Sequence, residues 1–499
     1  MSGSTAVSIS IPNYPDSNLV PGVYAGVDPS GANTGSVAQR ALLFGQALAG
    51  STILAGVPQI VSSPSLIDAS AGAGSMLAGM VRAFRRRNTY TELWVLSLED
   101  DPAAVAATGS VQFAGTATAA GTLSLYVAGQ VVALGVAAGD AGASIAIGLQ
   151  AATTFLPNLP VGVVANAANG TVAFTALNKG ASGNDIDIRL NYYGAQAGEA
   201  TPPGLQVTIS PMSGGSQNPT ALPTALANLG NQPFDYIACP YVDTVSLNTV
   251  QAFLNDATGR WSWQQETFGG AWAAFRGTLA QRTTFASGRN DQHVYIMGFY
   301  DSPSPAWEWA ADFCAEVAGS LQVDPAVPVT QLAMGVLAPP IASQDTISER
   351  NTLLTDGMST FTIDASGQVI IERVVSTYTT NPAGAPDNSY RDCETLYTLM
   401  AVIRDLRIQL QSQFARKKLV ADGTRIPGGS NQVTAQIVLA VAKALYVTYC
   451  TRGWAQDAPG FAAGALGQNA GGGLVKLLLP VRVANQLRTI AMSIQFAKP

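Results

Sequence analysis

FDYIACPYV, at residues 234–242, is a buried-strand run and the first of four segments that decide the fold. It is followed by SLNTVQAFLNDATGRW (246–261), QHVYIMGFY (292–300) and PAWEWAADFCAEVAGSL (305–321). The first and third are short apolar runs, and the second and fourth repeat apolar residues at helical spacing. Strands that alternate with helices predict an α/β region whose sheet is covered by helices. We expect Ser246 to cap the first of these helices.

The preceding 200 residues divide into two parts of different character. QRALLFG (39–45), SMLAGMVRAFRRRN (75–88) and TELWVLSL (91–98) predict a β-α-β unit that belongs with the α/β region. Residues 108–197 are instead rich in Ala, Gly, Thr and Val, with alternating apolar positions. This pattern predicts a small β-rich domain inserted into the α/β region, with one helix near 143–155.

The last 150 residues predict an α+β region. FTIDASGQVIIERVVSTY (361–378) indicates a hairpin that turns at Ser366-Gly367. Long helices are expected over 392–418 and 433–452. Two strands, LVKLLLPVRV (474–483) and LRTIAMSIQF (487–496), are expected to close the chain.

Both chain ends carry strand signals without a nearby partner. Apolar residues alternate with small or polar ones, and four prolines between residues 12 and 29 favour extended chain at the first end. Because an unpaired strand invites addition to another sheet, we expect both ends to pair with something remote in sequence. The alternating residues are Val7, Ile9, Ile11, Ile490, Met492, Ile494 and Phe496.

These observations predict six segments in an α/β and α+β multidomain chain with extended, strand-forming termini. They are an N-terminal linking arm (1–30), the first part of the α/β core (31–107), the inserted β-rich domain (108–197), the second part of the α/β core (198–345), the C-terminal α+β domain (346–486) and a C-terminal linking strand (487–499).

The composition suits a protein that buries large surfaces. Of 499 residues, 47% are hydrophobic and only 12% are charged, against about 25% charged in ordinary soluble domains. Either many surfaces are small and Ala/Gly-rich, or much of the surface meets copies of the same chain. No secretory signal and no apolar stretch of about 18 residues is visible, so we expect folding in a cytoplasm.

Candidate catalytic and metal-binding residues are few. The single histidine, His293, lies in an expected strand, and no GxSxG motif occurs, so a structural histidine is favoured. The four cysteines are widely spaced and predict buried free thiols; with one histidine, a zinc site is not expected. These cysteines are Cys239, Cys314, Cys393 and Cys450.

Two further motifs were weighed for ligand binding. Gly72-Ala73-Gly74 precedes a helix whose N-terminus could bind an anion, but position 77 is Leu where a dinucleotide motif needs Gly, and a tight turn is favoured. The carboxylate pairs Asp100/Asp101 and Asp185/Asp187 are interpreted as solvated turn residues. We therefore predict no catalytic residue, no cofactor and no metal.

A basic group marks the C-terminal region. Residues 346–499 hold 15 Lys and Arg against 10 Asp and Glu, although the whole chain has a net charge of −6. The group either balances a helix dipole on a solvated face or docks an acidic partner; nucleic acid is disfavoured because aromatic residues are not interleaved. Its members are Arg404, Arg407, Arg416, Lys417, Lys418 and Arg425.

An ordered set of motifs resembles the Mu-like contractile bacteriophage tail sheath family. VPGVYAGVD (20–28) matches its PGVY signature at Pro21, Gly22, Val23 and Tyr24. DPAVPVTQLAMGVLAPP (324–340) and the ending IAMSIQF (490–496) also fit. The most specific match lies within 347–399, at Asn351, Leu353, Leu354, Gly357, Gly367, Arg373 and Thr377-Tyr378-Thr379-Thr380.

The resemblance implies a structural subunit of a virion tail and no enzyme. It implies a middle region that is subtilisin-like in fold only, helically stacked hexameric rings around an inner tail tube, and contraction that drives the tube through the host envelope. The implied partners are copies of the same chain, the tube protein, and the baseplate and tail terminator proteins, with no direct nucleic acid and no membrane insertion. Assembly is expected in the host bacterial cytoplasm, with the insertion on the outer surface.

The resemblance and the strand patterns together assign candidate site residues. The inter-subunit links are Val7, Ile9, Ile11, Pro21, Gly22, Val23, Tyr24, Ile490, Met492, Ile494 and Phe496. The tube-facing residues are Arg404, Arg407, Arg416, Lys417 and Lys418. The alternatives are the sheath of a phage-derived bacteriocin or injection system, a tube or baseplate subunit, and, less favoured, an α/β hydrolytic enzyme.

Overall fold

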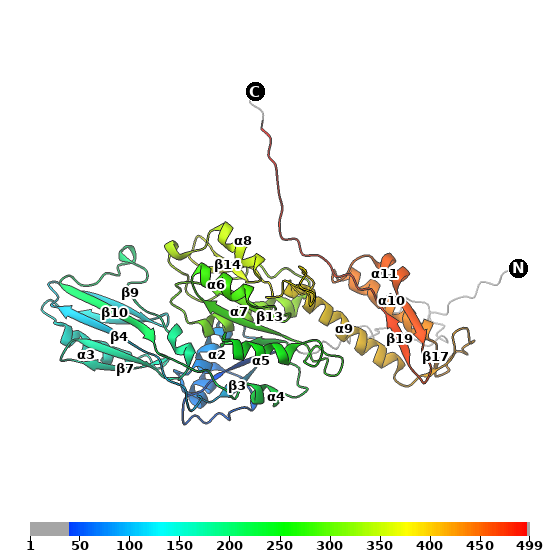
Figure 1. The fold of residues 1–499 in the computed structure, drawn as a ribbon, viewed down its shortest axis with the longest axis horizontal. Coiled ribbons are helices and arrows are strands. Elements are labelled where there is room, and N and C mark those ends of the chain that lie inside the picture. Colours follow the sequence, from blue (N-terminus) through cyan, green and yellow to red (C-terminus); the bar gives the residue numbers. More distant parts are fainter. Residues whose placement is uncertain (1–38, 497–499) are drawn as a thin grey trace, which may run out of the picture. The chain divides into compact units, whose positions relative to one another are not determined.

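The α/β region is built on a six-stranded sheet in a computed structural model that describes residues 39–496 (Figure 1). Its strand order is β13-β12-β11-β1-β3-β2; all neighbours are parallel except β2, which runs antiparallel to β3 at the edge. Strands β1, β11 and β13 are buried almost throughout, as expected for a sheet covered on both faces. The strands are β1 (Arg40–Gln46), β2 (Pro58–Ile60), β3 (Glu92–Leu98), β11 (Tyr236–Ala238), β12 (Gly270–Arg276) and β13 (Val294–Phe299).

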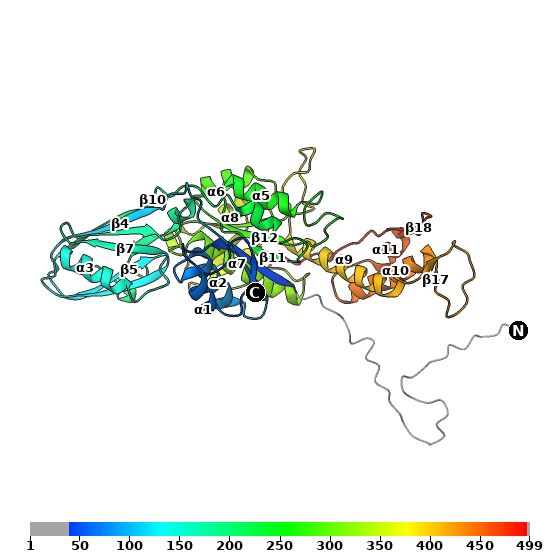
Figure 2. The ribbon, with the colours of Figure 1, turned by 90° about the horizontal axis from the view of Figure 1, so that it is seen from below.

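Helices cover the two faces of this sheet. The chain passes from β1 to β3 in one direction and then from β11 to β13 in the other, so right-handed crossovers place the two sets of helices on opposite faces. Figure 2 shows α5 and α6 on one side and α2 and α7 on the other. The helices are α1 (Pro64–Ile67), the π-helix η2 (Asp68–Gly72), α2 (Met76–Arg87), α4 (Leu222–Ala227), α5 (Thr244–Leu254), α6 (Leu279–Ser287) and α7 (Ala306–Val323).

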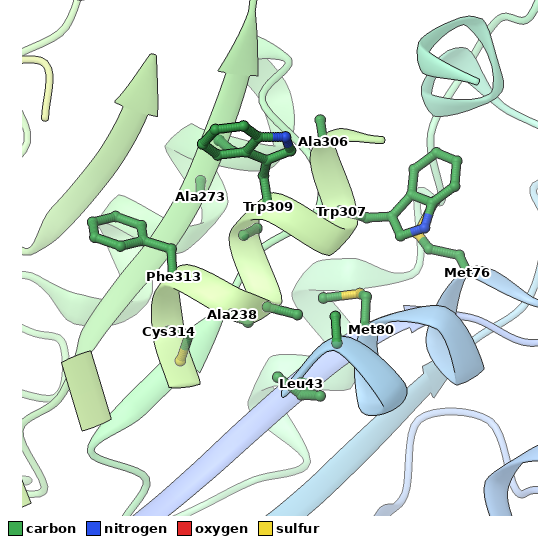
Figure 3. Close-up of a cluster of buried hydrophobic side chains, with 14 of the residues drawn as sticks. Leu43, Met76, Met80, Ala238, Ala273, Ala306, Trp307, Trp309, Phe313 and Cys314 are labelled. Atoms are coloured by element: carbon green, nitrogen blue, oxygen red, sulfur yellow. The ribbon is translucent and has the colours of Figure 1, made fainter. Parts of the chain in front are cut away.

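Helix α7 is the centre of the main hydrophobic core (Figure 3). Trp309 and Phe313 point toward the sheet, where Phe313 packs edge-on against Trp272 of β12. Trp307 turns instead toward Met76 of α2. Each fully buried side chain of this size contributes about 2–3 kcal/mol through the area it removes from water.

The predicted cap of α5 was wrong. The helix begins at Thr244, and Asp243 is its N-cap, accepting a hydrogen bond from the backbone N–H of Ser246 at 2.9 Å. A carboxylate at a helix N-terminus also interacts favourably with the helix dipole, which a serine hydroxyl does not do. Ser246 is therefore a buried residue of the first turn.

The inserted region folds as two antiparallel sheets around α3. Its four-stranded sheet has the order β10-β4-β8-β7, and its three-stranded sheet has the order β6-β5-β9. Because β10 pairs with β4, the four-stranded sheet extends to Ser213, beyond residue 197. The elements are β4 (Thr108–Gly115), β5 (Gly121–Val127), β6 (Gln130–Val136), α3 (Gly142–Thr153), β7 (Val161–Asn166), β8 (Thr171–Ala176), η3 (Ala181–Asp185), β9 (Ile188–Leu190), η4 (Ala195–Ala197) and β10 (Leu205–Ser213).

The C-terminal region contains the predicted hairpin and both long helices. The hairpin turns at Ser366-Gly367, where Gly367 has a φ of 83°. The first long helix is shorter than predicted, because it ends at Phe414 and Lys418 lies in a short strand. The elements are η5 (Ile341–Ser343), α8 (Ile347–Thr355), β14 (Thr360–Ile363), β15 (Val369–Arg373), α9 (Cys393–Phe414), β16 (Lys418–Leu419), β17 (Gln432–Val433), α10 (Ala435–Thr451), α11 (Ala458–Gly464), β18 (Leu466–Asn469) and β19 (Val475–Leu478).

Helix α9 joins two hydrophobic clusters. Its first turns bury Leu396, Tyr397 and Met400 in the main core. Two residues further on, Val402 belongs to a second, smaller cluster with Tyr446 and Tyr449 of α10. We call the part of the chain built on this second cluster, residues 435–484, the α10 unit.

Some of the remaining expectations from the sequence agree with the structure and others do not. All four cysteines are free thiols; Cys239, Cys314 and Cys393 are buried, as predicted, whereas Cys450 is only half-buried. Across the described part of the chain, no helix combines the length and apolarity that crossing a bilayer needs. Of the two closing strands, the first is reduced to β19, and 487–496 forms no strand within the described chain.

Candidate assembly surfaces

His293 has a structural role at the start of β13. Its ring is 3% exposed and stacks on Trp261 with 4.4 Å between ring centroids. Nε2 lies 2.7 Å from Oδ1 of Asp256, whose other oxygen accepts a hydrogen bond from the Tyr390 hydroxyl. Burial lowers the pKa of His293, although Asp256 opposes that shift. Because an ionised carboxylate can only accept, Nε2 is the donor of this hydrogen bond. The side chain thus ties β13 to the loop after α5, as predicted.

The N-terminus of α2 has no room for an anion. The Ser75 hydroxyl accepts from the N–H of Ala78 at 3.1 Å, and Oδ1 of Asn178 accepts from the N–H of Met76 at 2.8 Å. A Cβ on Gly74 would lie 2.5 Å from the Leu159 carbonyl oxygen, which explains the glycine at this position. The tight-turn interpretation is confirmed, and the group that fills the usual anion position is Asn178, which follows β8 of the insertion.

Three of these four carboxylates are not solvated turn residues, so the prediction was wrong for Asp100, Asp185 and Asp187. Asp101 accepts from the backbone N–H of Ala103 at 2.9 Å in an exposed turn, as predicted. Asp100 accepts hydrogen bonds from the Gln46 side chain at 2.6 Å and from the backbone N–H of Lys179 at 2.9 Å. Asp187 forms an ion pair with Arg189, and Asp185 lies 3.7 Å from Arg276. The reason is topological, because the segment after β8 of the insertion lies against the core, where Asp100 binds the Lys179 N–H and Asp185 lies near Arg276. Within residues 39–496, no cluster of three metal-ligating side chains occurs.

The basic group separates into two sets. Arg404 and Arg407 share a helix face, but that face lies against the core: Nη1 of Arg404 is 2.5 Å from Oδ1 of Asp235, and Arg407 pairs with Glu266. The guanidinium carbon of Arg404 also lies 5.4 Å from the centroid of the Phe268 ring. Arg404 therefore holds α9 on the α/β core, in contrast to its expected exposure, whereas Arg407 stays exposed beside its partner Glu266.

The second basic set stays exposed at the far end of α9. It consists of Arg416, Lys417 and Lys418, with Arg425 exposed in the following loop. In the described chain none of the four forms an ion pair, and Lys417 reaches only the Asn431 side chain, at 3.5 Å. Three neighbouring unpaired cations attract an acidic surface more strongly than the paired arginines of the same helix.

The C-terminal tail exposes a row of large apolar side chains. Ile490 is 69% exposed, Met492 80%, Ile494 86% and Phe496 85%. No backbone hydrogen bond joins residues 489–496 to the rest of the described chain. Alternating apolar residues on an extended segment with free N–H and C=O groups suit addition to the edge of another sheet.

A second strand surface was missed by the sequence analysis. Strands β18 and β19 form a two-stranded antiparallel sheet that packs on α10, and Leu466, Leu474 and Leu478 are exposed on it. A two-stranded sheet is at best marginally stable alone, and both strands of this one have a free edge in residues 39–496. The run Gly471-Gly472-Gly473, with φ values of 79°, 59° and 84°, is the turn signal that could have revealed it.

The other expected linking residues cannot be placed. Val7, Ile9, Ile11, Pro21, Gly22, Val23 and Tyr24 lie outside the described residues.

Comparison with known proteins gives one consistent result. The family described as phage tail sheath protein central domain matches residues 214–377. The Mu-like prophage FluMu tail sheath protein of Haemophilus influenzae is 37% identical over 98% of this chain and 100% of its own length.

Two solved structures are similar to the chain at low sequence identity. The anti-feeding prophage baseplate structure contains a chain 10% identical, with a TM-score of 0.50 over 96% of this chain and 100% of that one. A sheath tail protein of Listeria innocua is 14% identical, with a TM-score of 0.46 over 90% of this chain and 93% of that one.

Proposed function

The chain belongs to the Mu-like phage tail sheath proteins, and from that premise we propose how its surfaces build and operate a contractile sheath. It is a structural tail protein and not an enzyme. The proposal is a helical homopolymer of hexameric rings around the inner tail tube, assembled in the host cytoplasm and joined to baseplate and terminator proteins at its ends. The single observation that carries it is the apolar, unpaired tail at 490–496.

The tail is proposed to complete a sheet in a neighbouring copy. Ile490, Met492 and Ile494 alternate with small residues, so one face of an added strand would be apolar throughout. The β18–β19 hairpin is the proposed acceptor, because it offers free edges and exposed leucines. The N-terminal residues Val7, Ile9, Ile11 and Pro21 to Tyr24 are proposed to link copies in the same way. A contact that joins one surface of a copy to a different surface of the next generates open helical filaments.

The exposed basic set is proposed to face the tube. Arg416, Lys417 and Lys418 provide unpaired charge for an acidic tube surface, whereas Arg404 is assigned to the bond between α9 and the core and Arg407 to its pair with Glu266. If the far end of α9 lies on the inner side of the sheath, next to the tube, the insertion is proposed to lie on the outer surface of the sheath.

Contraction is proposed to need no nucleotide. Copies polymerise in an extended, metastable packing, and the links persist while the bodies move to a tighter packing. The six predicted segments are the proposed units of that motion, with the insertion extended to Ser213 and the first turns of α9 moving with the core. We also retain the subtilisin-like arrangement as a proposal for the middle region, supported by its mainly parallel, helix-covered sheet.

Co-expression with the tube protein, followed by negative-stain imaging, tests the tube-facing assignment. The wild-type chain should give striated sheath on tubes, and Lys417→Glu with Lys418→Glu should give sheath that no longer encloses tube. Arg425→Glu, an exposed change in the next loop, is the matched control. Normal tube-bound sheath from the double variant would contradict the assignment.

A further inference from the structure

The path of the chain after β19 touches the molecule in two places. At the first, the backbone N–H of Arg482 donates to the Tyr446 hydroxyl at 3.0 Å, and that of Ala484 donates to the Trp454 carbonyl at 3.0 Å. Leu479 and Val481 pack against the second cluster beside them. This segment belongs to the α10 unit.

At the second place the chain returns to the α/β core. Nη2 of Arg488 lies 2.9 Å from Oε2 of Glu394 and 3.0 Å from Oδ1 of Asp392, at the start of α9. Glu394 is fully buried, and its other oxygen accepts from the N–H of Val329 at 2.7 Å. Asp392 is shared with Arg373, at 2.9 Å. Arg488 therefore supplies the cation that faces a buried carboxylate of the core.

We propose that Arg488 anchors the root of the C-terminal arm to the α/β core, so that the arm leaves the molecule from the start of α9 and not from the α10 unit. This proposal rests on the proposed linking function of the arm. The planar guanidinium can donate to two carboxylates at once, which a lysine ammonium on a flexible stem does less well. Beyond it, residues 489–496 make no backbone hydrogen bond within the described chain.

The contact of Arg488 determines which part of the molecule receives a force that is applied to the C-terminal arm. Helix α9 has its first turns in the main core and its later turns against the α10 unit. Without the anchor, a neighbour that pulls the arm would pull through the segment at 481–484 and move the α10 unit. With it, the load passes through Arg488 into α9 and β15, and the α10 unit can reorient while the link stays fixed to the core.

A spin-label distance in the unassembled chain tests the anchor. Nitroxides are placed at Ser348→Cys, exposed on α8, and at Thr489→Cys, directly after the anchor, in a Cys450→Ser background; the other three cysteines are buried. The anchored root should give one narrow distance distribution. Arg488→Met should abolish the narrow peak.

Two further variants separate the anchor from general stability. Arg488→Met leaves Glu394 buried without a cation and can unfold the chain, so Glu394→Gln with Arg488→Met removes both charges and should also lose the narrow peak. Arg482→Met is the matched control: its pair with Asp457 is exposed, with side chains 64% and 38% accessible, and the peak should remain.

The outcomes distinguish this proposal from the linking function. A narrow distribution that survives in the folded double variant overturns the anchor, whatever the arm does in the polymer. If the peak is lost but the variant chains still form wild-type sheath that contracts normally, the root is anchored without carrying load, and the mechanical part of the proposal is overturned. Failure of the linking function itself would show in the truncated chain described below.

Discussion

The strands of the insertion and the C-terminal tail have the same sequence pattern and opposite structures. In β8, Val172, Phe174 and Ala176 alternate with exposed residues, and all three are buried because β4 and β7 flank the strand and α3 packs on the sheet they form. In the tail, Ile494 and Phe496 alternate in the same way and are at least 85% exposed. Period-2 alternation thus predicts which side chains form an apolar face. Whether that face is buried within the same chain depends on where the partner strand lies.

Truncating one phenylalanine in each region tests the comparison with the largest expected effect. Phe174→Ala should destabilise the unassembled chain by about 3–5 kcal/mol, because it leaves a cavity in the insertion. Phe496→Ala should leave the unfolding free energy unchanged and weaken assembly. Chemical denaturation of unassembled chains measures the first, and sedimentation of polymer measures the second. A lower unfolding free energy of the unassembled Phe496→Ala chain would show that the tail packs against its own chain.

The same comparison applies to charges that are paired within the chain and charges that are not. Asp235 is buried and pairs with Arg404, so Arg404→Met should lower the unfolding free energy by about 3 kcal/mol, chiefly through the carboxylate left without its partner. Lys417→Met removes a cation without a paired carboxylate and should change stability little. Thermal unfolding of both variants measures this difference in stability. Equal stability of the two would contradict the internal role of Arg404.

A smaller effect comes from buried acids on α7. Burial raises the pKa of Glu308 to about 7, that of Asp312 to about 6 and that of Glu316 to about 7, although nearby arginines of α2 oppose the shift. The folded state therefore favours the neutral acids. Their contribution is fully present below the ordinary values of 4.5 for Glu and 3.8 for Asp, and is lost as the pH rises through about 6 to 7.

Raising the pH should thus weaken the body of the unassembled chain and leave its free tail unaffected. Between pH 5.5 and 8 this loss should appear as a falling midpoint of thermal unfolding. In Glu308→Gln the pH-dependent loss of unfolding free energy should be smaller by an amount on the order of 1 kcal/mol. An unchanged pH slope in that variant would show that Glu308 ionises freely.

Much of the α/β fold could be predicted because its signals are local. The apolar spacing gave α2, α7 and the core strands, and Ser366-Gly367 gave the hairpin. Errors arose where the partner lies far along the chain. Arg404 and Arg407 were recognised as sharing a helix face, but spacing does not reveal that Asp235, more than 160 residues away, lies opposite.

The candidate assembly surfaces could be predicted only in part from the sequence, for the same reason. The alternation of 490–496 predicted a strand with one apolar face; in the described chain these residues are exposed and form no strand. Nothing local identified Arg488 as the partner of Glu394, because Glu394 is 94 residues away. The proposed acceptor hairpin was missed because its first strand, β18, has only four residues, too short for a clear period, although β19 lies within the predicted strand 474–483.

Ending the chain after Thr489 tests most directly whether the last strand belongs to a neighbouring copy. This truncation keeps Arg488 and its carboxylates but removes the apolar row. We predict an unassembled chain with wild-type thermal stability that fails to form ordered cylinders in negative stain. Ordered cylinders from the shortened chain, or a lowered unfolding temperature of the unassembled protein, would contradict the account.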